Sequence, residues 1–171
     1  MDEIRKLVEK HFNNMQSEEF IPGETPVPTM AVPFGAEEVN EAIDSLLSTY
    51  VTMGKKVKKF EEMFCQYVQT KHGVMVNSGS SANFLALSIL TNPALKNRMK
   101  PGEEVITPAI TWVTTVYPIV NVGLTPVFID VNLDFNINPD LIEKAITEKT
   151  RAIMPVHLVG NPCRMKEIME I

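Results

Sequence analysis

The residues best suited to chemistry lie in a short turn at positions 77–83, which reads Asn-Ser-Gly-Ser-Ser-Ala-Asn. An apolar run at 73–76 precedes the turn and a helical pattern follows it, so the turn is expected to join a strand to a helix. The backbone N–H groups and the dipole at a helix start favour an anion. Gly79 would permit a tight turn, and the hydroxyls of Ser80 and Ser81 would add donors. Taken alone, the turn fits a phosphate site and a serine-capped helix without a ligand equally well.

A second turn of this kind, at residues 107–115, carries the only tryptophan of the chain, Trp112. An indole at a strand end can stack on a flat heteroaromatic ring, and it can equally be a core side chain. The turn that reads Thr-Pro-Ala-Ile-Thr-Trp therefore leaves both interpretations open.

Two further polar residues follow apolar runs. His157 can serve a cofactor or satisfy backbone groups, and Asp130 can hold its own loop or reach the site. His11 and His72 have no cysteine or carboxylate at ligand spacing, so no metal site is expected.

The apolar runs alternate with helical patterns from residue 73 onward, which is typical of βαβ units and a buried parallel sheet. Parallel strands end at one sheet edge, where α/β proteins bind ligands. The turn at 77–83 is neither a Walker loop nor GxGxxG, so the expected ligand is a phosphorylated aromatic ring rather than a nucleoside triphosphate or a dinucleotide. Strands are expected at 73–76, 104–107, 125–131 and 151–158, with helices at about 81–90, 112–121 and 139–148.

The first part of the chain reads differently. Helical patterns are expected at 2–19, 36–50 and 57–70, and a proline-dense segment at 20–28 predicts an extended arm. The domains are therefore expected to be 1–35, a helix and arm, and 36–171, an α/β domain that lacks its later elements. The chain is expected to be a fragment, because residues 165–171 begin a helix that no glycine or asparagine closes.

Composition excludes several classes of protein. The chain has 171 residues, a net charge of −5 and one short lysine cluster at 55–59, which argues against nucleic-acid binding. The two cysteines, Cys65 and Cys163, form no close pair, and neither a signal peptide nor a membrane span is recognisable. A cytoplasmic location is expected.

Several motifs in sequence order resemble the DegT/DnrJ/StrS sugar aminotransferase family. They are the turn at 77–83, Pro-Gly-Glu-Glu-Val-Ile-Thr-Pro at 101–108, Thr-Trp-Val-Thr-Thr at 111–115, Thr-Pro-Val-Phe-Ile-Asp-Val at 125–131, Lys-Thr-Arg-Ala-Ile at 149–153 and His-Leu-Val-Gly-Asn-Pro at 157–162. The Phe-Ile-Pro-Gly arm at 20–23 and the insert at 91–100 are similar to the branch of CDP-4-keto-6-deoxyglucose 3-dehydrases of lipopolysaccharide pathways. Asn161 stands where aminotransferase members commonly carry glutamine.

The resemblance implies the N-terminal part of a fold type I enzyme that uses pyridoxal or pyridoxamine 5′-phosphate. It implies that Ser80 and Ser81 hold the phosphate, that Gly79 permits the turn and that Trp112 stacks on the pyridine ring. Thr52 and Gly54 match a Thr-x-Gly motif, which the resemblance places near the sugar-nucleotide site and for which it implies a homodimer interface.

The family's catalytic residues are expected beyond Ile171. They are an acidic partner of the pyridine nitrogen and a lysine in aminotransferases or a histidine in dehydrases. The expected function is removal of the C3 hydroxyl from a nucleotide-linked 4-keto-6-deoxysugar, with a reductase partner or glutamate in a second step. The alternatives are sugar transamination and a non-catalytic fragment, and the 171 residues alone are expected to be inactive.

Overall fold

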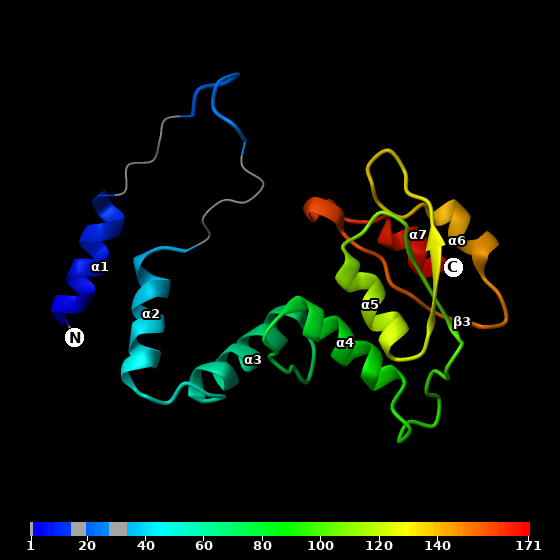
Figure 1. Ribbon diagram of the computed structural model, residues 1–171, viewed down its shortest axis with the longest axis horizontal. Coiled ribbons are helices and arrows are strands. Elements are labelled where there is room, and N and C mark those ends of the chain that lie inside the picture. Colours follow the sequence, from blue (N-terminus) through cyan, green and yellow to red (C-terminus); the bar gives the residue numbers. More distant parts are fainter. Residues whose placement is uncertain (1, 15–19, 28–33) are drawn as a thin grey trace. The chain divides into compact units, whose positions relative to one another are not determined.

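The computed structural model describes residues 2–14, 20–27 and 34–171, and its contacts divide the chain into two units, Met1–Gly73 and Val74–Ile171 (Figure 1). Each unit is described by itself. The domain boundary expected at residue 35 stays a prediction.

The described residues of the first unit form the helices α1 (Asp2–Asn14), α2 (Ala36–Leu47) and α3 (Lys55–Val68). The helices expected in this region are confirmed, although residues 15–19 lie outside the described residues. The guanidinium of Arg5 contacts the carboxylate of Asp44 at 2.7 Å and thereby connects α1 to α2. At the start of α2, the carboxylate of Glu38 accepts a hydrogen bond from the backbone N–H of Gly35, and this bond lowers the pKa of Glu38.

The proline-dense segment is a turn rather than an extended arm. The backbone N–H groups of Glu24 and Thr25 both donate to the carbonyl of Ile21, at 3.1 and 2.9 Å. Pro22 has the φ that suits the second position of a turn, and Gly23 has a positive φ of 85°, as a type II turn requires at its third position. The prediction overlooked that this Pro-Gly order favours a turn; Pro28 lies outside the described residues.

The second unit is built on a parallel sheet with the strand order β2-β1-β3. The strands are β1 (Glu104–Pro108), β2 (Thr125–Ile129) and β3 (Thr150–Ile153). Its helical elements are α4 (Gly79–Leu90), α5 (Val113–Asn121), α6 (Pro139–Ala145), a 3₁₀ turn η1 (Leu158–Gly160) and α7 (Met165–Glu170). The predicted α/β class with a parallel sheet and flanking helices is confirmed.

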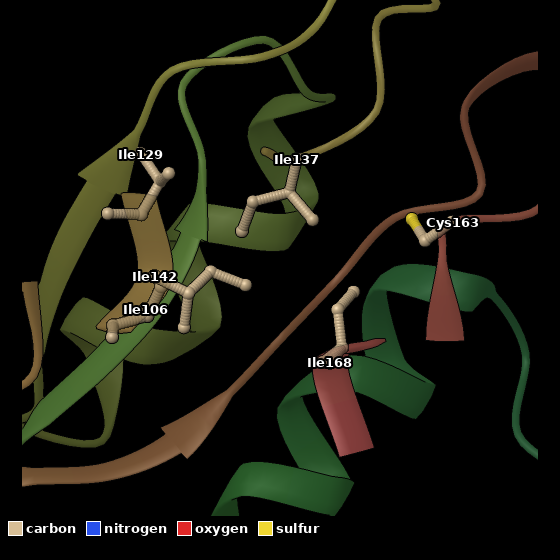
Figure 2. Close-up of a cluster of buried hydrophobic side chains, with 6 residues drawn as sticks. All are labelled: Ile106, Ile129, Ile137, Ile142, Cys163 and Ile168. Atoms are coloured by element: carbon tan, nitrogen blue, oxygen red, sulfur yellow. The ribbon is translucent and has the colours of Figure 1, made fainter. Parts of the chain in front are cut away.

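Two apolar clusters cover the two faces of the sheet, because successive side chains of a strand point to opposite faces. Val105 packs with residues of α4 and α5, including Leu87 and Ile119. Its neighbour Ile106 packs on the other face with Ile129, Ile137, Ile142, Cys163 and Ile168 (Figure 2). In Figure 1, α5 and α6 accordingly lie on opposite sides of the strands, and Ile168 of α7 packs on the same face as Ile142 of α6. The sheet is therefore the middle of three layers.

The strand expected at 73–76 is wrong, because this segment forms no ladder with the three strands. A strand exists only through a hydrogen-bonded neighbour, which apolar composition does not specify. The strand expected at 151–158 also ends early, at Ile153. The backbone N–H of Met154 still donates to Ile106, but Pro155 has no N–H with which to continue the ladder.

Helix α6 begins as the sequence predicts. The side chain of Asn138 accepts a hydrogen bond from the backbone N–H of Asp140 at 3.0 Å, and Pro139 occupies the first turn. The helix ends at Ala145, earlier than the expected residue 148. No helix in the described part of the chain is long and apolar enough to cross a bilayer.

Val159 is a β-branched residue in the left-handed region, with a φ of 54°, and its side chain is 96% exposed. This conformation costs a non-glycine residue about 1–2 kcal/mol, whereas glycine adopts it freely.

We predict that Val159→Gly raises the free energy of unfolding by about 0.5–1 kcal/mol, since strain is lost, little packing is lost and the unfolded chain gains some entropy. Urea denaturation of the purified chain measures the change. Val113→Gly, in the first turn of α5, is the matched control and should lower the same free energy. A destabilised Val159→Gly would show that the backbone is not strained at this position.

Candidate functional site

The start of α4 presents backbone donors that have no acceptor within the described residues. The N–H groups of Ser81 and Ala82 are bonded to the side chain and the carbonyl of Ser78, respectively. The N–H groups of Gly79 and Ser80 make no such bond in the described part of the chain, and Ser80 is exposed. A helix start with unbonded N–H donors is the kind of place where proteins bind anions.

The side chains of Asn77, Ser78 and Ser81 bond to one another. The hydroxyl of Ser81 donates to the side-chain oxygen of Asn77 at 2.6 Å, and the hydroxyl of Ser78 donates to that of Ser81 at 3.1 Å. The hydroxyl proton of Ser81 is therefore already used, unlike that of Ser80. These bonds hold the turn in one conformation before any anion arrives.

Gly79 has a role that differs from the expected one. It occupies the first helical position with no positive φ, so the turn does not require glycine for its backbone. A Cβ added there would meet no atom of the chain within 4 Å. The space beside the N–H groups of Gly79 and Ser80 is therefore open within the described residues.

The starts of α4 and α5 lie next to each other. The side-chain amide of Asn83, in α4, donates to the carbonyl of Thr114 in the first turn of α5, at 3.2 Å. Trp112 is the residue that precedes α5, and it is 73% exposed, so the core interpretation of this tryptophan is wrong. An exposed indole thus stands two residues from the bond that joins the two helix starts.

The segment after β3 is held by backbone bonds. The ring atom Nδ1 of His157 accepts a hydrogen bond from the backbone N–H of Cys163 at 3.0 Å, as the structural interpretation of this histidine expects. The thiol of Cys163 donates to the carbonyl of Val156, and burial raises the pKa of this thiol. Asp130 likewise holds its own loop, because its carboxylate accepts from the N–H of Val131.

Thr52 and Gly54 lie in the first unit. They line an open cavity of about 780 Å³ between the end of α2 and the start of α3, together with Tyr50, Lys55 and Lys56. A Cβ on Gly54 would lie 3.0 Å from the ring of Tyr50, so a larger residue there would have to displace this ring slightly.

Sequence reasoning missed Asn136, which is 2% exposed and whose side chain bonds three backbone groups of residues 158–162. An asparagine inside a polar loop gives no periodic signal that it is buried. Within the described residues, no three His, Cys, Asp or Glu side chains form a group that could hold a metal ion.

We predict that Ser78→Ala lowers the free energy of unfolding by about 1 kcal/mol, because the N–H of Ser81 loses its cap. Urea denaturation followed by circular dichroism provides the measurement. Ser80→Ala is the control and should change stability little, because the hydroxyl of Ser80 has no partner within the described part. Equal losses in the two variants would argue against the cap.

Comparison with known proteins finds relatives along nearly the whole chain. The chain is 40% identical over 172 residues to dTDP-4-dehydro-2,6-dideoxy-D-glucose 3-dehydratase of Saccharopolyspora spinosa. This match covers 99% of the chain and 37% of the relative. It is 39% identical to the lipopolysaccharide biosynthesis protein RfbH of Salmonella typhimurium, covering 99% of this chain and 40% of that protein. The chain thus spans well under half the length of these curated relatives.

A solved structure, the GDP-4-keto-6-deoxy-D-mannose-3-dehydratase of E. coli with bound hydrated PLP, is similar with a TM-score of 0.78. It is 37% identical, and the match covers 84% of this chain and 37% of that one. A family model for DegT/DnrJ/EryC1/StrS aminotransferases matches residues 33–171. The family resemblance of the sequence motifs is thereby confirmed, and the chain belongs to the DegT/DnrJ/EryC1/StrS aminotransferase family.

Proposed function

We propose that this chain supplies the cofactor-holding part of a sugar-nucleotide 3-dehydratase that uses pyridoxal or pyridoxamine 5′-phosphate. The observation that carries the proposal is the pairing of two helix starts by the bond from Asn83 to Thr114, with free N–H donors on one helix and an exposed indole before the other. A small molecule that carries both a phosphate and a flat ring could bind the N–H donors with its phosphate and the indole with its ring.

In this proposal the phosphate lies at the start of α4. The N–H groups of Gly79 and Ser80 and the hydroxyl of Ser80 donate to its oxygens, and the dipole of α4 stabilises its charge. Ser81 keeps its bond to Asn77 and shapes the turn. The open space beside Gly79 provides room for the phosphate.

Trp112 stacks on the pyridine ring, for which its exposure leaves one face of the indole available. Bound there, the cofactor supplies an electron sink for negative charge that develops on a substrate carbon. The contribution of these residues is to bind and orient the cofactor. The acidic partner of the ring and the histidine that exchanges a proton with the substrate are proposed to follow residue 171 in the whole protein.

The proposed substrate is a nucleotide-linked 4-keto-6-deoxysugar, which loses its C3 hydroxyl in deoxysugar or lipopolysaccharide synthesis. Support comes from the names of the similar proteins, among which 3-dehydratases recur. Thr52 and Gly54 are proposed to lie near the nucleotide, beside the cavity that Lys55 and Lys56 line. The protein is proposed to work in the cytoplasm with a reductase partner or glutamate. A lysine in place of the histidine would favour sugar transamination instead.

Pyridoxamine phosphate should quench the fluorescence of Trp112 on titration into the chain. We predict that Ser80→Asp weakens this binding at least about tenfold, or 1.4 kcal/mol, because the new carboxylate repels the phosphate. Ser88→Asp is the control: it adds the same charge to α4, eight residues or about 12 Å away along the helix. Inorganic phosphate should compete with the cofactor for wild type.

An unchanged indole signal in the wild-type chain would contradict the proposed cradle. Equal weakening by the two aspartates would place the anion elsewhere on the unit.

The whole protein is further proposed to be a homodimer. Support comes from an apolar stripe on α3 whose members are at least 42% exposed; it consists of Phe60, Met63, Phe64, Tyr67 and Val68. These residues recur at the spacing of one helix face.

We predict that the chain associates at high concentration through this stripe and that Phe64→Glu weakens the association about tenfold or more, since it would bury a charge. Sedimentation velocity over a range of concentrations measures the effect. Lys58→Glu, elsewhere on α3, provides a charged control. A monomer at every concentration would count against a dimer that forms through α3.

A further inference from the structure

Asn136 is a buried polar residue whose whole side chain is devoted to one loop. Its amide nitrogen donates to the carbonyls of Asn161 and Pro162, both at 3.2 Å. Its side-chain oxygen accepts from the backbone N–H of Leu158 at 3.3 Å. One side chain therefore grips residues 158–162 at both ends, across 22–26 residues of sequence.

Asn136 is itself held firmly. Its backbone N–H donates to the carboxylate of Asp134, and its carbonyl accepts from the N–H of Asn132. The next residue, Ile137, is buried in the cluster that Figure 2 shows, and it pairs with Val131 in an antiparallel bridge. The three side-chain hydrogen bonds of Asn136 to residues 158–162, called the clamp from here on, are thus anchored to the core of the second unit.

The backbone conformation of residues 158–162 is intrinsically unfavourable. Val159 lies within the 3₁₀ turn η1 at a φ of 54°, and Gly160 follows at a φ of 79°. A strained residue persists where its surroundings over-determine the backbone. Here the surroundings are the three bonds of Asn136 and the bond from the N–H of Cys163 to His157.

The loop follows β3, and the segment that carries Trp112 follows β1. These two strands are parallel neighbours, so both segments leave the same edge of the sheet. Asn136 also holds the carbonyl of Pro162, the residue before Cys163, whose backbone N–H donates to Nδ1 of His157. Because Nδ1 accepts from Cys163, the proton of a neutral His157 is on Nε2, which can then donate.

We infer that Asn136 is a positioning residue for the cofactor edge. By gripping the 158–162 loop it fixes the backbone of this segment, the tautomer of His157 and the shape of the edge beside the pyridine ring. The link to the ring rests on the proposed function, whereas the grip on the loop does not.

The test compares Asn136→Asp with Asn138→Asp in the chain. In N136D a carboxylate oxygen replaces the donor and faces two carbonyls, so the loop should be released. N138D makes the same chemical change two residues away, at a helix cap where aspartate is as good as asparagine. Nitrogen NMR of the imidazole reports the tautomer of His157, and hydrogen exchange reports the Leu158 amide.

Wild type and N138D should show the Nε2-protonated tautomer and a protected Leu158 amide. N136D should show mixed tautomers, at least tenfold faster exchange at Leu158 and at least tenfold weaker binding of pyridoxamine phosphate. Retention of all three properties would overturn the inference. Loss of the loop signals with unchanged affinity would overturn its link to the cofactor.

Failure of the proposed function gives a different result. If the wild-type chain bound no pyridoxamine phosphate, the cofactor link would fail with it, while the Leu158 and His157 signals would still decide whether Asn136 holds the loop.

A second variant covers the case in which N136D is too unstable for spectroscopy. Glycine at position 159 relieves the strain that the clamp opposes. In wild type, release of the loop also releases the strain at Val159 and so offsets part of the lost bonds, whereas the glycine background has no such strain to release. The fall in melting temperature that N136D causes should therefore be larger in a Val159→Gly background. Equal falls in the two backgrounds would show that the clamp does not act on this turn.

Discussion

The constraint on which the second unit depends is the parallel pairing of β1 with a strand on each side. Val105 and Ile106 are both fully buried, one on each face, so the strand is covered on both sides by helices. Because the three strands run in one direction, the segments that follow them leave the same edge. The indole before α5, the loop after β2 that contains Asn136 and the loop after β3 leave the same edge for this reason, although up to about 50 residues separate them in sequence.

Much of this arrangement could be predicted from the sequence. The helix positions, the cap at Asn138 and the parallel α/β class follow from periodicity and from residues with specific backbone preferences. Local patterns identify elements that are stabilised within themselves. The failures concern structure that depends on a distant neighbour: residues 73–76 are apolar enough for a strand, but composition does not say whether a strand lies beside them.

The candidate site shows the same division. Ser80 and Trp112 could be identified because a helix start and a single indole are visible in the sequence. The hydrogen bonds from Asn83 to α5 and from Asn136 to the loop after β3 could not be identified in this way. Asparagine side chains occur both in solvent and in buried hydrogen-bond networks, so the residue type does not indicate the partners. The sequence also could not show that the hydroxyl of Ser81 has a partner within its own turn, and the expected contact of Ser81 with a phosphate stays a prediction.

The buried thiol of Cys163 has a consequence for the chemical durability of this edge. Oxidants and electrophiles attack the thiolate, and burial keeps this sulfur protonated by raising its pKa. Its proton is directed at the carbonyl of Val156, and its backbone N–H holds the ring of His157. The thiol of Cys163 is therefore in its least reactive form, so the loop after β3 should retain its shape under oxidative conditions that would modify an exposed cysteine.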